Sequence, residues 1–140
     1  MDDIILGKDL VDSRNIRLLY QPQDVILEVD KGRITQVISN LLTNAIKFTK
    51  KGTITVATII DEDNNQNIIS IKDTGSGIDP EILPDLLSKF TAKSFSGTGL
   101  GLFISKSIVE AHGGKIWAEN NVDGKGATFT FSIPMSEQKP

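Results

Sequence analysis

The 140-residue sequence contains no cysteine and only one histidine, His112. Without cysteine, a disulfide framework, a thiolate zinc site and a cysteine nucleophile are excluded. With one histidine, a histidine-rich metal cluster is excluded as well. His112 precedes two glycines, Gly113 and Gly114, at the end of an expected helix. We therefore expect it to cap or pack against that helix rather than to catalyse a reaction.

The sequence also lacks a basic excess and a long apolar run. Its 15 Lys and Arg residues against 18 Asp and Glu give a formal net charge of −3, which argues against a nucleic-acid partner. No apolar run approaches the roughly 20 residues of a membrane span, and the acidic start at Asp2 and Asp3 is unlike a signal peptide. We expect a single soluble domain over residues 1–140, with a core over about 15–134 and a polar tail over 135–140.

Two amphipathic helices are predicted from the spacing of apolar residues. One carries them from Ile34 to Ile46 at three- and four-residue intervals, with Asp30 as its N-cap and Gly52 as its stop. The other spans about 100–111 and ends at the two glycines that follow His112. A shorter helical piece is expected around 81–90.

Short strands make up most of the remainder. The β-branched and alternating runs are 16–20, 25–29, 53–60, 67–72, 115–119 and 127–133. The third and fourth runs form one expected hairpin, and the fifth and sixth form another. This combination predicts an α+β fold, a two-layer sandwich with helices on one face of a mixed, mostly antiparallel sheet.

A polar stripe follows the first helix beside its apolar face. Asn40, Asn44 and Lys47 lie within one sector at 100° per residue, and Arg33 is near the same line. A carboxamide oxygen can bind Mg²⁺, and a lysine one turn further can meet phosphate. A solvated helix face is the alternative, but two asparagines in mid-helix are unfavourable and need a reason.

Asp73 directly follows a predicted strand. Residues Ile69, Ile71 and Asp73 share a face by period two, so the carboxylate continues a buried row and needs a hydrogen-bond donor. Gly75 and Gly77 then allow either a close approach of the backbone to a ligand or a tight turn.

The second helix opens with glycines at alternate positions. The run reads Gly97, Thr98, Gly99, Leu100, Gly101, Leu102. Free backbone N–H groups at a helix N-terminus suit a phosphate, although the run matches neither a Walker A loop nor G-x-G-x-x-G. A flexible hinge is the alternative.

Taken in order, these segments closely resemble the N, G1 and G2 boxes of sensor histidine kinases. The closing stretches His112–Trp117 and Gly126–Phe129 extend the resemblance, which covers about residues 15–134. The family it indicates is the catalytic ATP-binding domain of two-component histidine kinases. That domain has the Bergerat fold, within the wider GHKL group of gyrase-type, heat-shock-90-type and mismatch-repair ATPases.

The resemblance implies a site for Mg-ATP. Asn44 would bind the Mg²⁺ that bridges the phosphates, with Asn40 and Lys47 nearby as catalytic residues, and Asp73 would accept from the adenine amino group. The other implied ATP-binding residues are Phe48, Ile78 and Leu102 as walls, Gly75 and Gly77 beside the base, Gly97, Thr98, Gly99, Leu100 and Gly101 at the phosphates, Lys93 on a lid over about 89–96, and Thr128 near the aspartate. At the lid the family usually has two phenylalanines where this chain has Leu87 and Phe90.

The implied activity is transfer of the γ-phosphate of ATP to a histidine on a separate dimerisation domain of the same kinase, which then serves a response regulator. The resemblance also implies a cytoplasmic domain, monomeric when isolated. One alternative is a GHKL-type ATPase, but those relatives carry a glutamate base where this chain has Asn40, and a carboxamide does not take a proton near neutral pH. A stand-alone anti-sigma-type serine kinase and a pure binding module remain as further alternatives.

Overall fold

The computed structural model describes residues 16–21, 29–49, 51–87 and 100–135. Their elements are β1 (Ile16–Gln21), α2 (Lys31–Phe48), β2 (Gly52–Asp61), β3 (Gln66–Asp73), η1 (Leu83–Asp85), α3 (Leu100–Ala111), β4 (Lys115–Asn120) and β5 (Ala127–Pro134). The strand expected over 25–29 lies almost wholly outside the described residues. No helix in the described ranges is long and apolar enough to span a membrane.

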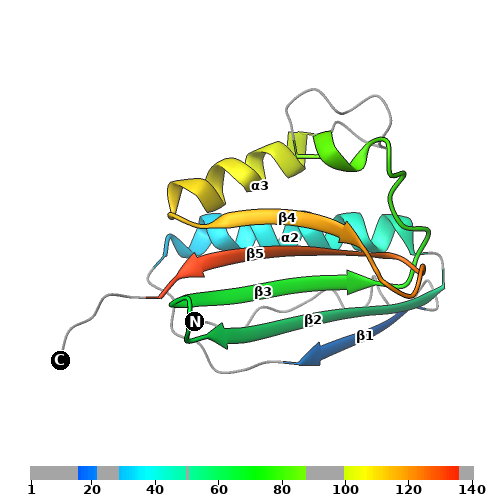
Figure 1. Ribbon diagram of the computed structural model, residues 1–140, viewed down its shortest axis with the longest axis horizontal. Helices are drawn as coiled ribbons and strands as arrows, with labels where there is room; N and C mark the ends of the chain where they lie inside the picture. Colours follow the sequence, from blue (N-terminus) through cyan, green and yellow to red (C-terminus); the bar gives the residue numbers. More distant parts are fainter. Residues whose placement is uncertain (1–15, 22–28, 50, 88–99, 136–140) are drawn as a thin grey trace.

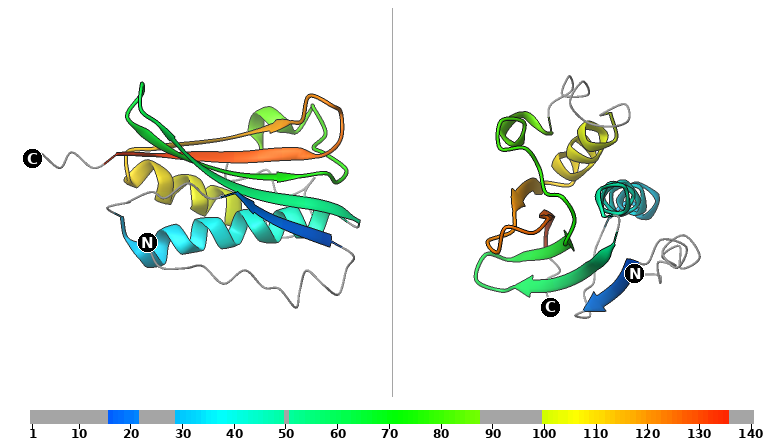
Figure 2. Two further views of the ribbon diagram at one scale, coloured as in Figure 1. Left: turned by 90° about the horizontal axis from the view of Figure 1, so that it is seen from below. Right: turned by 90° about the vertical axis from the view of Figure 1, so that its right-hand side faces the viewer.

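The strands form one five-stranded sheet in the order β1-β2-β3-β5-β4. β1 runs parallel to β2, and the other neighbouring pairs are antiparallel. Both helices lie on one face of the sheet (Figures 1 and 2). The predicted fold class, a two-layer α+β sandwich with a mixed sheet, is therefore confirmed, as are both predicted hairpins.

The first predicted helix is confirmed as α2, with one correction at its end. Its N-cap is Asp30, whose carboxylate accepts from the N–H of Arg33 at 3.1 Å. The helix ends at Phe48 with Thr49 as its C-cap, and Gly52 is the first residue of β2 instead of the helix stop. The carbonyl of Phe48 accepts from the N–H of Ser76, so a contact distant in sequence takes up the end of the helix.

The helical piece expected over 81–90 is shorter than predicted within the described residues. Only a single 3-10 turn, η1, forms there. The carbonyl of Asp79 accepts from the N–H groups of Ile82 and Leu83, and Pro84 then has no N–H to continue the ladder. Residues 88–90 lie outside the described part of the chain.

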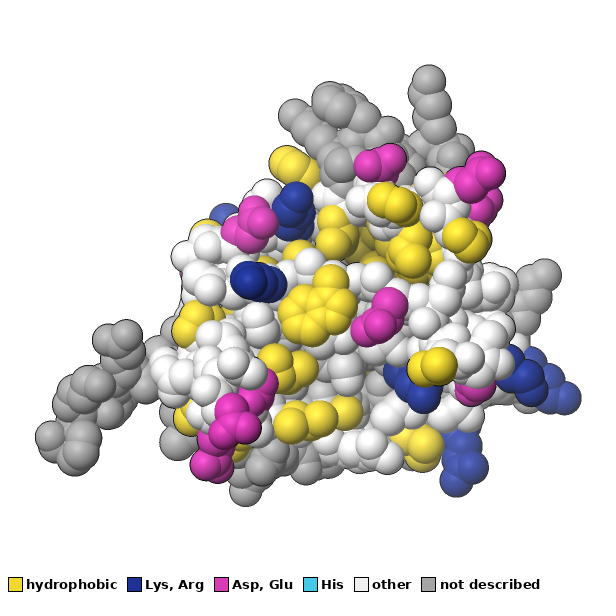
Figure 3. All heavy atoms as spheres, in the orientation of Figure 1, with side chains coloured by type: hydrophobic (Ala, Val, Ile, Leu, Met, Phe, Trp, Pro, Cys, Tyr) yellow, Lys and Arg dark blue, Asp and Glu magenta, His cyan; other side chains and the backbone are white. Residues whose placement is uncertain are grey.

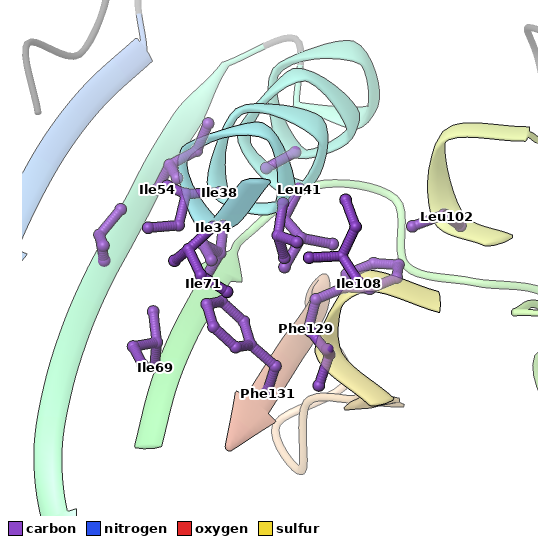
Figure 4. Packing of buried hydrophobic residues seen from close by; sticks show 14 of the residues in the cluster. Ile34, Ile38, Leu41, Ile54, Ile69, Ile71, Leu102, Ile108, Phe129 and Phe131 are labelled. Atoms are coloured by element: carbon purple, nitrogen blue, oxygen red, sulfur yellow. The ribbon is translucent and has the colours of Figure 1, made fainter. Parts of the chain in front are cut away.

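The core lies between the sheet and the two helices (Figure 4). Leu41 of α2, Ile71 of β3 and Phe131 of β5 are fully buried in it, and burying each such side chain contributes about 1.5–3 kcal/mol. The apolar stripe predicted for α2 is confirmed by its buried residues, which are Ile34, Val37, Ile38, Leu41, Ala45 and Ile46. The opposite face of the sheet carries hydrophobic side chains over its middle (Figure 3).

His112 joins the two helices at the end of the molecule where α2 begins and α3 ends. Its Nδ1 lies 2.8 Å from the carbonyl oxygen of Ile108, and its Nε2 accepts from the N–H of Asp30 at 3.1 Å. The next two residues close α3, because Gly113 bonds back to Glu110 and Gly114 to Val109. The capping role predicted for His112 is confirmed.

Candidate functional site

Three of the predicted segments meet at the other end of the helices. They are the C-terminal half of α2, the turn over residues 73–78 (called the aspartate turn below) and the first turn of α3. The N–H of Ser76 donates to the carbonyl of Phe48 at 3.2 Å. The side-chain amide of Asn40 donates to the carbonyl of Gly101, also at 3.2 Å. Residues more than sixty positions apart in sequence therefore form one site.

The Asp73 carboxylate lies at the base of this site. It is 3% exposed, and its Oδ1 accepts from the N–H of Gly75 at 2.9 Å and from the N–H of Ala127 at 3.3 Å. Within the described ranges no donor bonds to its other oxygen, Oδ2. A carboxylate oxygen accepts hydrogen bonds, so this atom can accept from an N–H group of a ligand.

Burial raises the pKa of Asp73 above its ordinary value of 3.8. Removal from water disfavours the charged carboxylate, and this cause outweighs the opposing hydrogen bonds from the Gly75 and Ala127 N–H groups. The environment of Asp73 therefore disfavours its charged form.

Two glycines fit the aspartate turn against its neighbours. A Cβ on Gly75 would overlap the backbone carbonyl of Phe48, so the turn can lie this close to α2 only without a side chain. A Cβ on Gly126 would overlap the carbonyl of Asp73 and lie 2.7 Å from its Oδ1, and Gly126 also has φ +82°. Gly77, with φ +78°, makes the tight turn that was one of its two predicted uses.

The residues of the polar stripe of α2 differ in burial and in their contacts. Asn40 and Asn44 are half-buried, and Lys47 is exposed on the last turn. The Asn40 amide donates to Gly101 and also to the hydroxyl of Ser105, at 3.1 Å, so this residue is bound to α3. No group of three or more His, Cys, Asp or Glu side chains that could hold a metal ion occurs in the described residues.

Of the remaining predicted ATP-binding residues, some are described by the structure and others lie outside its described part. Phe48 ends α2 and Ile78 ends the aspartate turn, and both are half-buried, whereas Leu102 is 3% exposed in the core. Leu100 and Gly101 are the first two residues of α3. Lys93, Gly97, Thr98 and Gly99 lie outside the described residues, as does the lid over about 89–96.

The resemblance implied that Thr128 lies near the Asp73 carboxylate, but its side chain lies on the other face of the sheet. In the sheet register Thr128 pairs with Lys72, the residue before Asp73, so its side chain points to the face away from the helices. Its hydroxyl donates to Oδ1 of Asn121 at 2.6 Å. The position beside the carboxylate is occupied by the backbone N–H of Ala127.

Four residues of the site were missed in the sequence. Asn120 and Asn121 bond to the aspartate turn, Ala127 bonds to its carboxylate, and Ser105 accepts from Asn40. Ala127 falls in the closing stretch that carried the resemblance, which was a usable signal. The asparagines had none, because their partners are 42 and 48 residues away.

A cavity of 370 Å³ lies on the other side of these asparagines. It is lined by Lys72, Glu119, Asn120, Asn121, Val122, Asp123 and Thr128. Lys72, Glu119 and Thr128 occupy adjacent register positions on the face of the sheet away from the helices. This cavity is therefore separate from the site around Asp73.

Comparison with known proteins gives the class to which this fold and site belong. Residues 29–137 match the family described as histidine kinase-, DNA gyrase B-, and HSP90-like ATPase. The match spans α2, the aspartate turn, α3 and the last hairpin. The chain belongs to this family.

Individual relatives narrow the class further. The chain is 37% identical to the sensor histidine kinase WalK of Bacillus subtilis over 124 residues, which are 84% of this chain and 20% of WalK. It is 37% identical to the sensor protein SrrB of Staphylococcus aureus, over 91% of this chain and 25% of SrrB. The chain thus spans about a fifth to a quarter of these relatives.

Solved structures agree. The nucleotide-free catalytic domain of the histidine kinase ThkA superposes with a TM-score of 0.81 at 33% identity, over 91% of this chain and 84% of that domain. Full-length ShkA in complex with AMPPNP superposes with a TM-score of 0.80 at 26% identity, over 94% of this chain and 28% of ShkA. Within the family, the chain is therefore an ATP-binding catalytic domain of the sensor histidine kinase type.

Proposed function

We propose that this domain binds Mg-ATP with its adenine at Asp73 and its phosphates between α2 and the start of α3. The observation that carries the proposal is the Asp73 carboxylate, which is 3% exposed and has one oxygen bonded within the fold and the other left for a donor. The adenine 6-amino group is a donor of the required kind.

Phe48 and Ile78 border the same turn and would contact the base, with Leu102 behind it. The phosphates would meet the backbone N–H groups at the start of α3, where the helix dipole favours negative charge. Our proposal extends this phosphate contact to Gly97, Thr98, Gly99 and Gly101, and to Lys93.

A magnesium ion at this site would be held partly by its nucleotide. Asn44 would supply a carboxamide oxygen, and phosphate and water oxygens would complete the shell, since Mg²⁺ commonly has few protein ligands in such sites. When bound, the ion supplies charge neutralisation along the triphosphate. Lys47, one turn from Asn44, would add a further positive charge near the γ-phosphate.

We further propose that the γ-phosphate passes to a histidine on a separate dimerisation domain of the same cytoplasmic kinase, and from there to a response regulator. The imidazole nitrogen attacks the γ-phosphorus, the bond to the bridging oxygen breaks, and ADP leaves. Asn40 supports transfer over hydrolysis, because both N–H bonds of its amide engage α3 and a carboxamide does not activate water.

Titration calorimetry tests the adenine assignment. Asp73→Asn removes an acceptor and places an amide against the amino group of the base, so ATP affinity should fall about 10- to 100-fold. Asp79→Asn, an exposed aspartate six residues further on, is the matched control and should leave affinity unchanged. Equal affinity of Asp73→Asn and the unmodified domain would refute the assignment.

Incubation with labelled ATP and a candidate dimerisation domain tests the transfer. We expect an acid-labile phosphohistidine on the dimerisation domain and little release of inorganic phosphate by the catalytic domain alone. Rapid steady-state hydrolysis without transfer would instead indicate an ATPase.

A further inference from the structure

Two adjacent asparagines at the end of β4 bond to both ends of the aspartate turn. Asn120 pairs with the last residue of that turn, Ile78, and Asn121 bonds to its first residue, Asp73. We call these two side chains the asparagine pair. We infer that the asparagine pair positions the aspartate turn to recognise the base, which makes both residues positioning residues for nucleotide specificity.

Asn120 makes a two-point contact with a single residue. Its Oδ1 accepts from the N–H of Ile78 at 2.8 Å, and its Nδ2 donates to the carbonyl of Ile78, also at 2.8 Å. Because a backbone N–H only donates and a carbonyl only accepts, the amide has one productive orientation. The contact replaces the pairing that another strand would give and fixes the position of Ile78.

Asn121 fixes the other end. Its Nδ2 donates to the carbonyl of Asp73 and to that of Lys125, each at 2.8 Å, and its Oδ1 accepts from the hydroxyl of Thr128 at 2.6 Å. Asn121 therefore fixes the backbone of Asp73 to the β4–β5 loop. Thr128 acts through Asn121 from the opposite face of the sheet.

Together these bonds hold the backbone at both ends of the aspartate turn from the β4–β5 hairpin. The N–H of Ala127, on the same hairpin, bonds to Oδ1 directly. The free oxygen of Asp73 is consequently aimed by residues 120–127. Removing the bonds of the asparagine pair should weaken the contact with the adenine amino group more than the contacts with the phosphates.

This inference rests on the proposed role of Asp73, and a double-mutant cycle separates the two. ATP affinity is measured by titration calorimetry for the unmodified domain, Asn120→Leu, Asp73→Asn and the double variant. Asn120→Leu should lower ATP affinity about tenfold in the unmodified domain. It should have little further effect in the Asp73→Asn background, because residues that act on the same ligand contact couple.

Further variants and a second nucleotide distinguish a loss of adenine recognition from a general loss of stability. Asn120→Asp keeps the acceptor for the Ile78 N–H but replaces the donor with a carboxylate oxygen that repels the Ile78 carbonyl, so it should lower ATP affinity at least as much as Asn120→Leu. Asn64→Leu, in the β2–β3 turn, removes an exposed asparagine and is the matched control. For a triphosphate whose purine lacks the 6-amino group, Asn120→Leu should lower affinity far less than for ATP.

Each outcome is decisive. If Asn120→Leu weakens ATP binding by the same factor with and without Asp73→Asn, its role is merely structural and the inference is overturned. If Asp73→Asn weakens binding and Asn120→Leu does not, the inference alone fails. If Asp73→Asn leaves affinity unchanged, the adenine assignment and this inference fail together.

Discussion

Asn40 of α2 and Ser105 of α3 are joined by a hydrogen bond of 3.1 Å from the amide Nδ2 to the hydroxyl Oγ. Ser105 is fully buried and Asn40 is half-buried, so the bond is partly shielded between the helices. The same amide also donates to the carbonyl of Gly101. The first turn of α3 is thereby fixed to the polar stripe of α2.

Ser105→Ala should lower the free energy of unfolding by about 1–3 kcal/mol, because it leaves an N–H of Asn40 without its buried partner. Urea denaturation measures the change. Ser107→Ala is the control, since that exposed hydroxyl bonds only within α3, to the carbonyl of Phe103, and should change stability by less than about 0.5 kcal/mol. Equal losses in the two variants would contradict a special role for the Asn40–Ser105 bond.

Asp73→Asn should stabilise the nucleotide-free domain at neutral pH while weakening ATP binding. Because its folded-state pKa is raised, Asp73 contributes most to stability below pH 3.8. That contribution is lost as pH rises through the raised pKa. The variant keeps an acceptor oxygen for Gly75 and Ala127 but never acquires a buried charge.

The difference in unfolding free energy between Asp73→Asn and the unmodified domain should therefore grow with pH and then level off above the raised pKa of Asp73. Urea titrations from pH 4 to pH 8 measure it. A variant that becomes relatively less stable as pH rises would show that the carboxylate is favoured in its charged form.

Gly126→Ala should prevent normal folding or lower the free energy of unfolding by about 3 kcal/mol or more, because the new Cβ would overlap the carbonyl of Asp73. Gly124→Ala is a matched control. Its φ is +80° against +82° for Gly126, but a Cβ there meets nothing within 4 Å. The control should lose only the conformational cost, about 1 kcal/mol. Similar losses at both positions, measured by thermal denaturation, would rule out the overlap.

His112→Leu should destabilise the domain by about 1–2 kcal/mol and leave ATP affinity unchanged. The Nδ1 contact with Ile108 holds the ring against the end of α3, and the Nε2 contact with Asp30 joins it to the start of α2, away from Asp73. In the neutral ring, nitrogen NMR should find the proton on Nδ1, since Nε2 accepts from Asp30. A proton on Nε2, or a loss of ATP affinity in the variant, would contradict this role.

Local patterns in the sequence predicted the main elements well. The apolar spacing from Ile34 to Ile46 and the capping side chain of Asp30 are properties of one continuous segment, so they define α2 without tertiary information. The end of α2 was misplaced because it depends on the bond between Phe48 and Ser76, which only the folded chain brings together.

The site was predictable where its residues follow a local period and not where they depend on sheet register. The burial of Asp73 followed from alternation with Ile69 and Ile71. The face occupied by Thr128 also followed from its alternation with Phe129, but its position relative to Asp73 did not, because that depends on the register between β3 and β5. The asparagine pair was hidden for a related reason, since β5 enters between β3 and β4 and brings the last hairpin to the aspartate turn.

Because β5 lies between β3 and β4, the sheet can be completed only after the last strand in the sequence has been synthesised. The strand supplies Phe129, Phe131 and Ile133 to the core and the Ala127 N–H to Asp73, yet it is the last strand of the sheet to leave the ribosome. A nascent chain that stops before Ala127 has β3 and β4 without the strand that separates them, and its Asp73 carboxylate has lost one of its two N–H donors. We therefore expect a chain terminated before this strand to be less stable and to lack the completed aspartate turn.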